Sequence, residues 1–360
     1  MSRYFSEKYK NLTPYTPGEQ PKDMKYLKLN TNESPFPPSE KAIAMAAEAA
    51  KDLQLYPDPE CRGLTQAIAD CLGVDFSEVL VTNGSDEILN FAFMAYCDSK
   101  TPAVFPDITY GFYPVFAEIN NLPYQQIPLK VDFTIDINNY IGINKTIFIA
   151  NPNAPTGIAL KPSQIEQILK SNPDNIVVVD EAYVDFGGES CVPLIKKYDN
   201  LLVTQTFSKS RSMAGARLGF GVGSAALIQD LNTIKYSTNP YNINRMTMAA
   251  GLGVMADEDY TKANCKAIIE SREYTISELK RLGFLVTDSI ANFVFAKHPG
   301  ISGKELYLKL KENGVLVRHF DKKIISDYNR ITIGTKEQMK ILICEIEKIL
   351  EANNVKNHDI

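Results

Sequence analysis

Short apolar segments rich in β-branched residues recur along the first two-thirds of the chain, and polar or turn-forming residues bound each of them. Segments with this pattern are typical of strands that are buried on both faces of a sheet. Helical patterns lie between most of the segments, and strands that alternate with helices favour a mostly parallel sheet. The strands are expected at residues 79–82, 103–105, 146–150, 176–180, 201–205 and 218–223.

The pattern changes after Met255, where a long amphipathic helix is predicted over residues 261–282. Shorter apolar segments follow this helix, with helical patterns between and after them, which is typical of an α+β domain. The strands of this part are expected at residues 284–286, 292–297, 315–318 and 330–334.

The chain is expected to divide into an arm and two domains. Residues 1–38 are rich in Pro, Asn and Tyr and show little periodicity, which indicates an irregular arm that needs a surface to lie on. Two helical patterns, at 39–52 and 62–71, begin a large α/β domain over residues 39–255. A smaller α+β domain takes residues 256–360, and a chain of this length is long enough for two domains.

The overall composition argues against several classes of function. The formal net charge is −5, so the chain has no broad electrostatic attraction for nucleic acid or anionic lipid, and local basic residues must hold any anionic ligand. The six cysteines are scattered without a Cys-x-x-Cys pair, and the three histidines lack metal-ligand spacing. No apolar segment has the length of a membrane span and no signal peptide is evident, so we expect a cytoplasmic protein with reduced thiols and no metal.

The strongest candidates for catalytic and phosphate-binding residues follow the strand expected at 201–205. Lys209 lies just past that strand, with the hydroxyls of Thr206 and Ser208 before it and Arg217 eight residues after it. A lysine amine can form a Schiff base with an aldehyde, and hydroxyl and guanidinium groups can bind a phosphate. A lone loop lysine is usually solvated and a lone arginine usually lies on the surface, but the set of four groups makes that interpretation much weaker.

An aspartate ends the strand expected at 176–180. Asp180 is therefore expected at the edge where parallel sheets form ligand crevices. Its carboxylate could keep the nitrogen of a pyridine ring protonated, and Tyr183 could hydrogen-bond an oxygen of the same ring. For Asp180 taken alone, a helix cap is the common alternative.

Two loops that follow strands add weaker signals. Gly84, Ser85 and Asp86 join a strand to a helix, and the free amides of a helix N-terminus can form a phosphate site. An ordinary capped helix start is the alternative there. The turn at 151–157 follows another strand and could contact a cofactor, although Asn, Pro and Gly are also common turn formers.

Further short motifs accompany these elements, namely Leu12-Thr-Pro-Tyr15, LNTNES (29–34), Tyr56-Pro-Asp, TNGSDE (82–87), Thr109-Tyr110-Gly, Pro155-Thr-Gly, DEAY (180–183), Gly-Val-Leu-Val-Arg318 and Arg330-Ile-Thr-Ile-Gly-Thr. In this order the set resembles the fold-type I pyridoxal-phosphate enzymes over nearly the whole chain, and within that class the histidinol-phosphate aminotransferase family. The resemblance implies a large domain with a mostly parallel seven-stranded sheet and a smaller α+β domain. It also implies pyridoxal 5′-phosphate as the cofactor and a homodimer with shared active sites, in which the arm packs against the small domain or the partner subunit.

The resemblance assigns a role to each matched position. Lys209 would bond covalently to the cofactor and then move a proton between the substrate and the cofactor, while Asp180 would pair with the pyridine nitrogen. Tyr183 would bond the ring oxygen, and Tyr110 would stack on the ring face. The cofactor phosphate would be held by Gly84, Ser85, Asp86, Thr206, Ser208 and Arg217, and by Tyr56 from the neighbouring subunit.

The resemblance also implies that the substrate is held by its far anionic group. Arg318 and Arg330, helped by Tyr15 and Asn32, would bind a phosphate or a carboxylate, because forked guanidinium donors suit both anions. Surface ion pairing is the alternative for two arginines at strand ends.

One position departs from the pattern of the family. The family has Asn directly before Pro-Thr-Gly, with its amide on the ring oxygen, whereas this chain has Ala154 there and Asn153 one residue earlier. Either Asn153 reaches the ring oxygen or Tyr183 holds it alone.

The implied reaction converts histidinol phosphate and 2-oxoglutarate to imidazole-acetol phosphate and glutamate, reversibly, within histidine biosynthesis. Threonine-phosphate decarboxylase, which is a lyase, and an aromatic amino-acid aminotransferase are alternatives on the same fold. The segments around Arg318 and Arg330 favour the first activity. A non-catalytic ligand sensor is a weaker alternative, because such regulators usually carry an extra DNA-binding domain and this chain is acidic.

Overall fold

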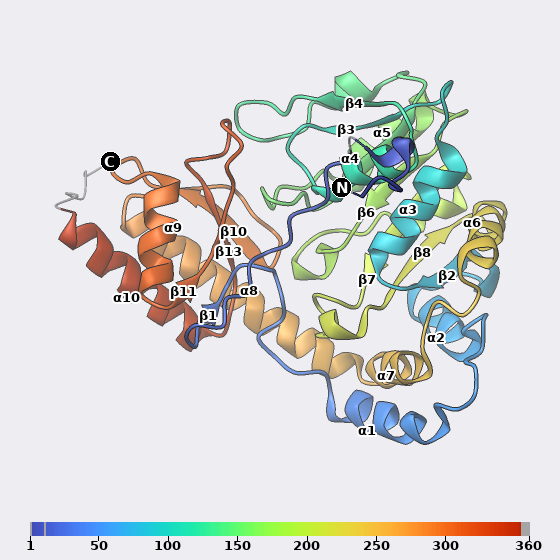
Figure 1. The fold of residues 1–360 in the computed structure, drawn as a ribbon, viewed down its shortest axis with the longest axis horizontal. Helices are drawn as coiled ribbons and strands as arrows, with labels where there is room; N and C mark the ends of the chain where they lie inside the picture. Colours follow the sequence, from blue (N-terminus) through green and yellow to red (C-terminus); the bar gives the residue numbers. More distant parts are fainter. Residues whose placement is uncertain (1, 11, 354–360) are drawn as a thin grey trace.

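The computed structural model describes residues 2–10 and 12–353, which form two lobes connected by a long helix (Figure 1). The larger lobe contains a seven-stranded sheet with the order β2-β8-β7-β6-β5-β3-β4. The run from β7 to β4 is parallel, whereas β8 lies antiparallel to both of its neighbours. The mostly parallel sheet predicted from the sequence is therefore confirmed. Its strands are β2 (Val79–Thr82), β3 (Ala103–Pro106), β4 (Tyr124–Ile127), β5 (Thr146–Ala150), β6 (Val177–Asp180), β7 (Leu201–Thr206) and β8 (Gly219–Gly223).

Helices on both faces of this sheet explain why its central strands are continuous apolar segments. Phe148, Val178 and Leu202 pack on α3, α4 and α6, and Ile147 and Val177 point to the other face, where α2, α5 and α7 cover them. The helices of this lobe are α1 (Glu40–Ala49), α2 (Arg62–Leu72), α3 (Ser85–Tyr96), α4 (Phe112–Ile119), α5 (Pro162–Ser171), α6 (Ala225–Thr238) and α7 (Arg245–Met255).

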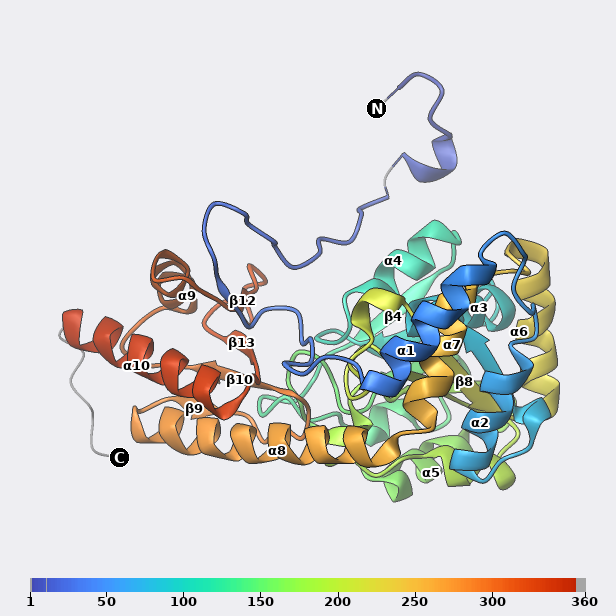
Figure 2. The ribbon, with the colours of Figure 1, turned by 90° about the horizontal axis from the view of Figure 1, so that it is seen from below.

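The smaller lobe has an antiparallel four-stranded sheet with the order β12-β13-β10-β9, packed on three helices. The arm reaches this lobe through β1 (Leu27–Lys28), which pairs with β11 (Val315–Leu316), and its first part extends away from both lobes (Figure 2). The remaining elements are β9 (Leu285–Val286), β10 (Phe293–Lys297), β12 (Arg318–His319), β13 (Asn329–Thr332), α8 (Glu258–Arg281), α9 (Gly303–Glu312) and α10 (Lys336–Ala352).

The structure corrects several of the predicted elements. Strand β1 lies in the arm that was predicted to be irregular. Strand β4 was not predicted, because Ile127 is its one buried residue and the others are exposed, as expected at a sheet edge. The apolar segment at 315–318 is divided between β11, which pairs with the arm, and β12, which pairs with β13. Helix α8 begins at Glu258 instead of residue 261.

Two further points concern the chain as a whole. Within residues 2–10 and 12–353, each helix is too short or too polar to cross a membrane. Residues 354–360, which include His358 and end the predicted small domain, lie outside the described residues.

Candidate active site

A cavity of about 390 Å³ opens at the carboxyl edge of the large sheet. Ala150, Asp180 and Thr206 all line it, because they are the last residues of β5, β6 and β7 and parallel strands end at the same edge. The start of α3, the loop from Lys209 to Arg217, and Gln20, Thr31 and Glu33 of the arm also line it. The fold therefore brings together the segments from which the sequence predicted cofactor chemistry.

Lys209 follows the end of β7, and its side chain reaches this cavity. Its Nζ atom donates to the carbonyl oxygen of Thr31, 3.2 Å away, and lies 5.8 Å from the centre of the Tyr183 ring. Burial, together with the positive charge of Arg330, lowers the pKa of this amine to about 8. More of the amine is therefore neutral near physiological pH than for an exposed lysine, as a nucleophile or a base requires.

Asp180 is buried at the end of β6, where three donors hold its carboxylate. Oδ2 accepts from the hydroxyl of Tyr113 at 3.1 Å, and Oδ1 accepts from the amide of Ala182 and the hydroxyl of Thr204, each at 3.3 Å. Burial raises the pKa of Asp180 to about 6, and the three donors oppose that rise because they favour the ionised form. The carboxylate is thus placed to pair with a protonated ring nitrogen.

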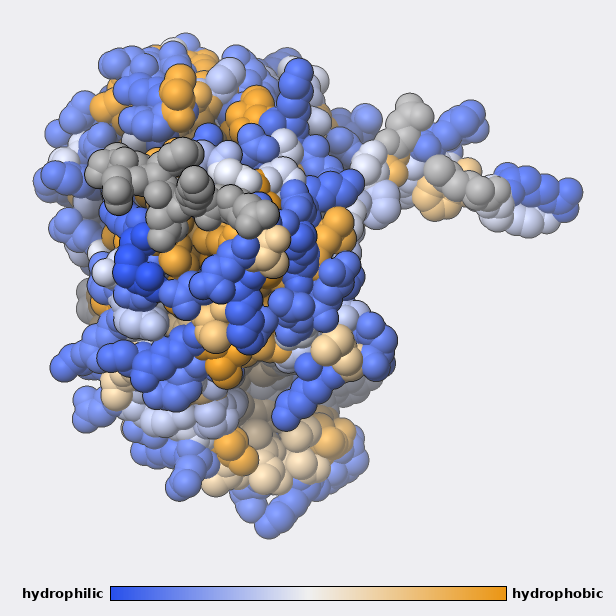
Figure 3. Space-filling view, turned by 90° about the vertical axis from the view of Figure 1, so that its left-hand side faces the viewer, coloured by the Kyte–Doolittle hydropathy of each residue, from blue (hydrophilic) through white to orange (hydrophobic). Residues whose placement is uncertain are grey.

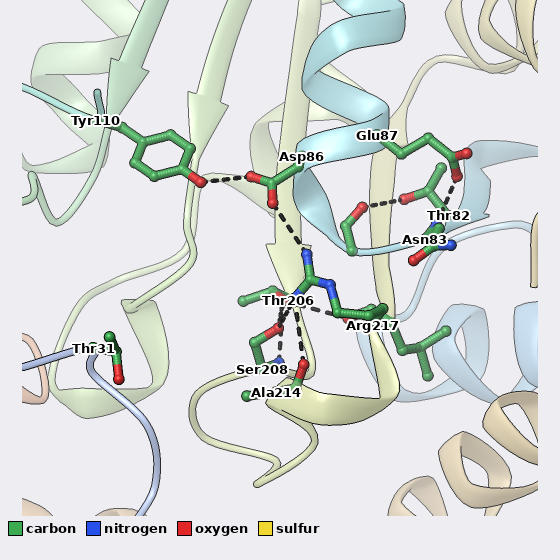
Figure 4. Close-up of polar contacts among 12 residues, drawn as sticks. Thr31, Thr82, Asn83, Asp86, Glu87, Tyr110, Thr206, Ser208, Ala214 and Arg217 are labelled. Atoms are coloured by element: carbon green, nitrogen blue, oxygen red, sulfur yellow. Dashed lines mark hydrogen bonds and ion pairs between the residues drawn. The ribbon is translucent and has the colours of Figure 1, made fainter. Parts of the chain in front are cut away.

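Hydroxyl and guanidinium groups gather at the start of α3 (Figure 4). Arg217 donates to Oδ2 of Asp86 at 3.0 Å and to the hydroxyl of Ser208 at 3.5 Å, and the hydroxyl of Thr206 donates to Ser208 at 2.9 Å. The hydroxyl of Tyr110 donates to Oδ1 of Asp86 at 2.6 Å. This set of donors next to a helix N-terminus suits a phosphate.

Two glycines let the backbone of this region pack closely. A Cβ atom on Gly84, which has φ of 76°, would lie 2.7 Å from Nη2 of Arg217. A Cβ atom on Gly219 would lie 2.4 Å from the amide nitrogen of Ser85. The first turn of α3 can therefore lie directly on β8, with Ser85 and Asp86 lining the cavity. The donors at the start of α3, with Thr206, Ser208 and Arg217, form a phosphate cradle. Together with Asp180 and the amine of Lys209, this cradle fits a pyridine cofactor that carries an aldehyde and a phosphate.

Tyr183 and Asn32 connect the two lobes at the edge of the cavity. Nδ2 of Asn32 donates to the hydroxyl of Tyr183 at 3.0 Å, and its Oδ1 accepts from the hydroxyl of Thr332 at 3.0 Å. Both amide atoms of Asn32 are thus engaged within the protein, and Asn32, which was predicted to contact the substrate, also lines a second cavity.

A second cavity of about 530 Å³ adjoins the first, and Tyr183 and Lys209 line both. Tyr15 of the arm lines the second cavity and stacks on Phe112, with a distance of 4.2 Å between the ring centroids. Tyr110 lies close by, with its ring centroid 6.5 Å from that of Tyr15. Most of the predicted cofactor residues and all of the predicted substrate residues therefore line one or the other of two adjoining cavities.

The two predicted anion-binding arginines differ in how much of each guanidinium is already occupied. Nη2 of Arg330 donates to the carbonyl oxygen of Asn30 at 2.9 Å, while its Nε is buried and has no hydrogen-bond partner among the described residues. Burial lowers the pKa of Arg330. Arg318 donates to the carbonyl oxygens of Thr16 and Pro17, at 3.1 and 3.2 Å, and so anchors the arm over the cavity. Arg330 thus makes one hydrogen bond to the arm, and Arg318 makes two.

Asn153 is not brought into either cavity. Its Nδ2 donates to the carbonyl oxygen of Ile108 and to the hydroxyl of Thr156, each at 3.0 Å, and its Oδ1 accepts from Thr109 at 2.8 Å. Ala154 lines both cavities in its place. The side chain of Asn153 thus connects its turn to the segment at residues 108–109, and Tyr183 is the predicted ring-oxygen donor that lines the cavity.

Tyr56 also lies away from both cavities of its own chain. Its side chain is 79 % exposed and stacks on Tyr241, with 4.7 Å between the ring centroids. The predicted contact of Tyr56 with a cofactor therefore requires a second subunit.

Sequence reasoning missed three contributors to the site. Thr204 lies beside Asp180 in the register of β6 and β7, and its position two residues before Thr206, on the same face of the strand, is a usable signal. Tyr113 follows Tyr110 by about one helical turn, which is a weaker signal. Thr31 has no local signal, because only its main-chain oxygen takes part.

The fold and the site together define a class of protein: an α/β enzyme with a lysine amine, a buried aspartate and a phosphate cradle at the carboxyl edge of its sheet. The sequence profile of the family aminotransferase class I and II matches residues 24–346, and the chain belongs to this family. It is therefore an aminotransferase dependent on pyridoxal phosphate, which confirms the fold class, the enzyme class and the cofactor predicted from the sequence.

Individual relatives extend over the whole chain. Histidinol-phosphate aminotransferase of Brachyspira hyodysenteriae is 50 % identical over 98 % of this chain and 100 % of its own length. The enzyme of the same name from Clostridium botulinum is 48 % identical over 97 % of this chain and 99 % of its own. The solved structure of histidinol-phosphate aminotransferase from Sinorhizobium meliloti, in complex with pyridoxal-5′-phosphate, has a TM-score of 0.84 at 22 % identity and covers 91 % of this chain and 92 % of that chain. This last likeness shows the fold.

Proposed function

We propose that this chain is a histidinol-phosphate aminotransferase, which exchanges an amino group between histidinol phosphate and 2-oxoglutarate in histidine biosynthesis. The observation that carries the proposal is the second cavity beside Lys209, which the half-buried Arg330 lines. A guanidinium there suits the phosphate of one substrate and the distal carboxylate of the other. The two relatives that match over nearly their full lengths bear this name.

Pyridoxal phosphate, when bound, supplies an electron sink for the negative charge that develops on the α-carbon of the substrate. We assign the covalent attachment and the proton transfer at that carbon to Nζ of Lys209, because its lowered pKa leaves neutral amine available. Asp180 keeps the ring nitrogen protonated. Tyr183 donates to the ring oxygen, because its own oxygen already accepts from Asn32. The groups that bind the cofactor phosphate are those of Gly84, Ser85, Asp86, Thr206, Ser208 and Arg217.

An absorbance titration tests the cofactor and the substrate separately. The purified protein should show the band of a bound cofactor, lose it on addition of L-histidinol phosphate and regain it on addition of 2-oxoglutarate. A band that responds to neither compound would refute the substrate and leave the cofactor standing. Release of carbon dioxide from threonine phosphate would then favour a threonine-phosphate decarboxylase. A response to aromatic amino acids would favour an aromatic amino-acid aminotransferase. Absence of the band after incubation with pyridoxal phosphate would refute the role of Lys209.

We further infer that the enzyme is a homodimer with shared active sites. Leu53, Leu55 and Tyr56 are each more than half exposed and lie in one short segment, and such apolar groups are typical of a subunit interface. The beginning of the arm extends from the lobes and exposes Tyr4 and Phe5, which also suits a partner surface (Figure 3).

Mixing two inactive variants tests the sharing of sites. Tyr56→Ala and Lys209→Ala subunits, each inactive or nearly so, should regain activity when they are co-refolded, because one site of each hybrid dimer then has both groups. Mass spectrometry should first confirm that dimers with one subunit of each variant have formed. If these hybrid dimers show no gain of activity, Tyr56 acts within its own subunit. Light scattering on the unmodified protein measures the number of subunits directly.

We place the enzyme in the cytoplasm, without a nucleic-acid or membrane partner. All six cysteines are free thiols, and a reducing compartment keeps them so. The net charge of −5 disfavours nucleic acid and anionic lipid.

A further inference from the structure

Tyr113 is a buried phenol that contacts two of the residues assigned to the cofactor ring. Its hydroxyl donates to Oδ2 of Asp180 at 3.1 Å, and its ring meets the ring of Tyr110 edge to face, with centroids 5.7 Å apart and an interplanar angle of 87°. Asp180 is assigned to the ring nitrogen, and Tyr110 is predicted to stack on the ring face. One side chain therefore contacts both the residue at the edge of the cofactor ring and the residue at its face.

The position of the Tyr113 hydroxyl is fixed by its surroundings. Tyr113 has no exposed surface, and its ring packs against Phe93, Phe105 and Phe148, with centroid distances of 6.4, 5.6 and 5.9 Å. Such aromatic packing leaves the ring little freedom to turn its hydroxyl elsewhere. The hydroxyl has no water to exchange with, so its bond to Asp180 is a lasting feature of the site.

The two oxygens of Asp180 are held unequally. Oδ1 accepts from Ala182 and Thr204, whereas Tyr113 is the one donor that reaches Oδ2 among the described residues. Loss of the Tyr113 hydroxyl would remove the one donor to Oδ2 that the described residues supply, which is costly for an ionised carboxylate.

We propose that Tyr113 is a positioning residue for the cofactor ring, acting through Asp180: its hydroxyl orients the carboxylate and keeps it ionised opposite the ring nitrogen. The proposal rests on the role assigned to Asp180 under the proposed function. The other titratable groups that act on Asp180 are Asp86, whose charge raises the pKa of Asp180, and the phenols of Tyr110 and Tyr183, whose own pKa values are raised by burial. The hydrogen bond from Tyr113 opposes the effect of Asp86 on the pKa of Asp180, because it stabilises the charged carboxylate.

The variant Tyr113→Phe tests this role, because it removes one oxygen and leaves the aromatic packing in place. The dissociation constant of pyridoxal phosphate from the variant should rise by about tenfold, because a carboxylate that is protonated more readily pairs less strongly with the ring nitrogen. The pH midpoint at which the absorbance of the bound cofactor changes should also move upward. The reason is that a ring with less positive charge leaves the nitrogen linked to Lys209 more basic.

Two further variants make the result specific. Tyr140→Phe is the matched control, since Tyr140 is equally buried but its hydroxyl has no partner in the described chain, and it should leave both quantities unchanged. Asp180→Asn should shift both quantities further, and adding Tyr113→Phe to it should then have no additional effect.

Each outcome separates this proposal from the proposed function. If Asp180→Asn shifts both quantities while Tyr113→Phe changes neither by more than about twofold, the positioning role of Tyr113 is wrong and the role of Asp180 stands. If Asp180→Asn itself changes neither quantity, both assignments are wrong. A full effect of Tyr113→Phe in the Asp180→Asn background would show that Tyr113 acts by another route. Thermal unfolding of each variant without cofactor shows whether the fold is retained.

Discussion

Nζ of Lys209 donates a hydrogen bond to the carbonyl oxygen of Thr31, 3.2 Å away, although 178 residues separate the two in the chain. The neighbouring carbonyl, that of Asn30, accepts from Arg330 of the small lobe. Two consecutive peptide groups of the arm therefore contact the amine of one lobe and the guanidinium of the other, which is predicted to bind the substrate anion. The arm thus links the predicted cofactor residues to the predicted substrate residues.

Replacing Lys209 by alanine should abolish turnover and leave the fold intact. The loss should be about 10⁴-fold or more, because both the covalent attachment and the proton transfer are assigned to this amine. Single-turnover absorbance after addition of L-histidinol phosphate measures it, with Lys170→Ala on the exposed face of α5 as the control. Near-normal transamination by Lys209→Ala would contradict the assignment.

The reactivity of Lys209 should depend on pH with a midpoint near its lowered pKa of about 8. The neutral amine is the reactive form, so the rate at which cofactor-free protein bonds pyridoxal phosphate should rise as the pH increases through that value. Arg330→Gln removes a positive charge that lowers this pKa, so its midpoint should lie at higher pH. A midpoint unchanged by Arg330→Gln would show that the guanidinium does not influence the amine.

Arg330→Leu should weaken the binding of histidinol phosphate more than that of the cofactor. Loss of a buried, charge-assisted contact should raise KM for this substrate by about 10- to 100-fold, while the dissociation constant of pyridoxal phosphate stays nearly constant. Steady-state kinetics and cofactor titration measure the two quantities. Arg281→Leu, which removes an exposed guanidinium of α8, is the control. An equal loss of cofactor affinity would place Arg330 at the cofactor instead.

Asn153→Ala should reduce stability and leave the absorbance of the bound cofactor unchanged. Its side chain makes three hydrogen bonds within its own part of the fold, so its loss should lower the free energy of unfolding by about 1–3 kcal/mol. Asn32→Ala should instead shift the absorbance, because Asn32 donates to Tyr183. Urea unfolding and absorbance spectra of both variants compare the two. A shifted absorbance spectrum for Asn153→Ala would indicate that Asn153 does contact the ring oxygen of the cofactor.

Gly219→Ala should weaken cofactor binding by about tenfold or more, because the added methyl would meet the amide of Ser85 at 2.4 Å and displace the start of α3. Gly63→Ala is the matched control, since its added methyl would make only ordinary contacts with Leu252, at 3.6 Å and beyond. Titration of the cofactor-free variants with pyridoxal phosphate measures the difference. Equal affinities would show that close packing of α3 on β8 is not required for binding.

Much of the fold and of the site follows from local patterns in the chain. The central strands are buried on both faces and so are continuous apolar segments, and Asp180 and Lys209 follow such segments directly. Parallel strands end at one edge of a sheet, so these residues were predictable neighbours. The edge strand β4 escaped prediction for the opposite reason, because solvent covers most of its side chains.

Contacts between distant segments could not be read in this way. The bonds from Tyr113 to Asp180 and from Asn32 to Tyr183 span 67 and 151 residues, and no local spacing records them. Asn153 and Ala154 are adjacent in the chain, yet the side chain of Asn153 bonds to residues 108 and 109 while Ala154 lines the cavities. Residue types and their order therefore indicate the chemistry that is possible. Which side chain reaches the cavity, and which donors bond to Asp180, depends on long-range packing that only the folded chain creates.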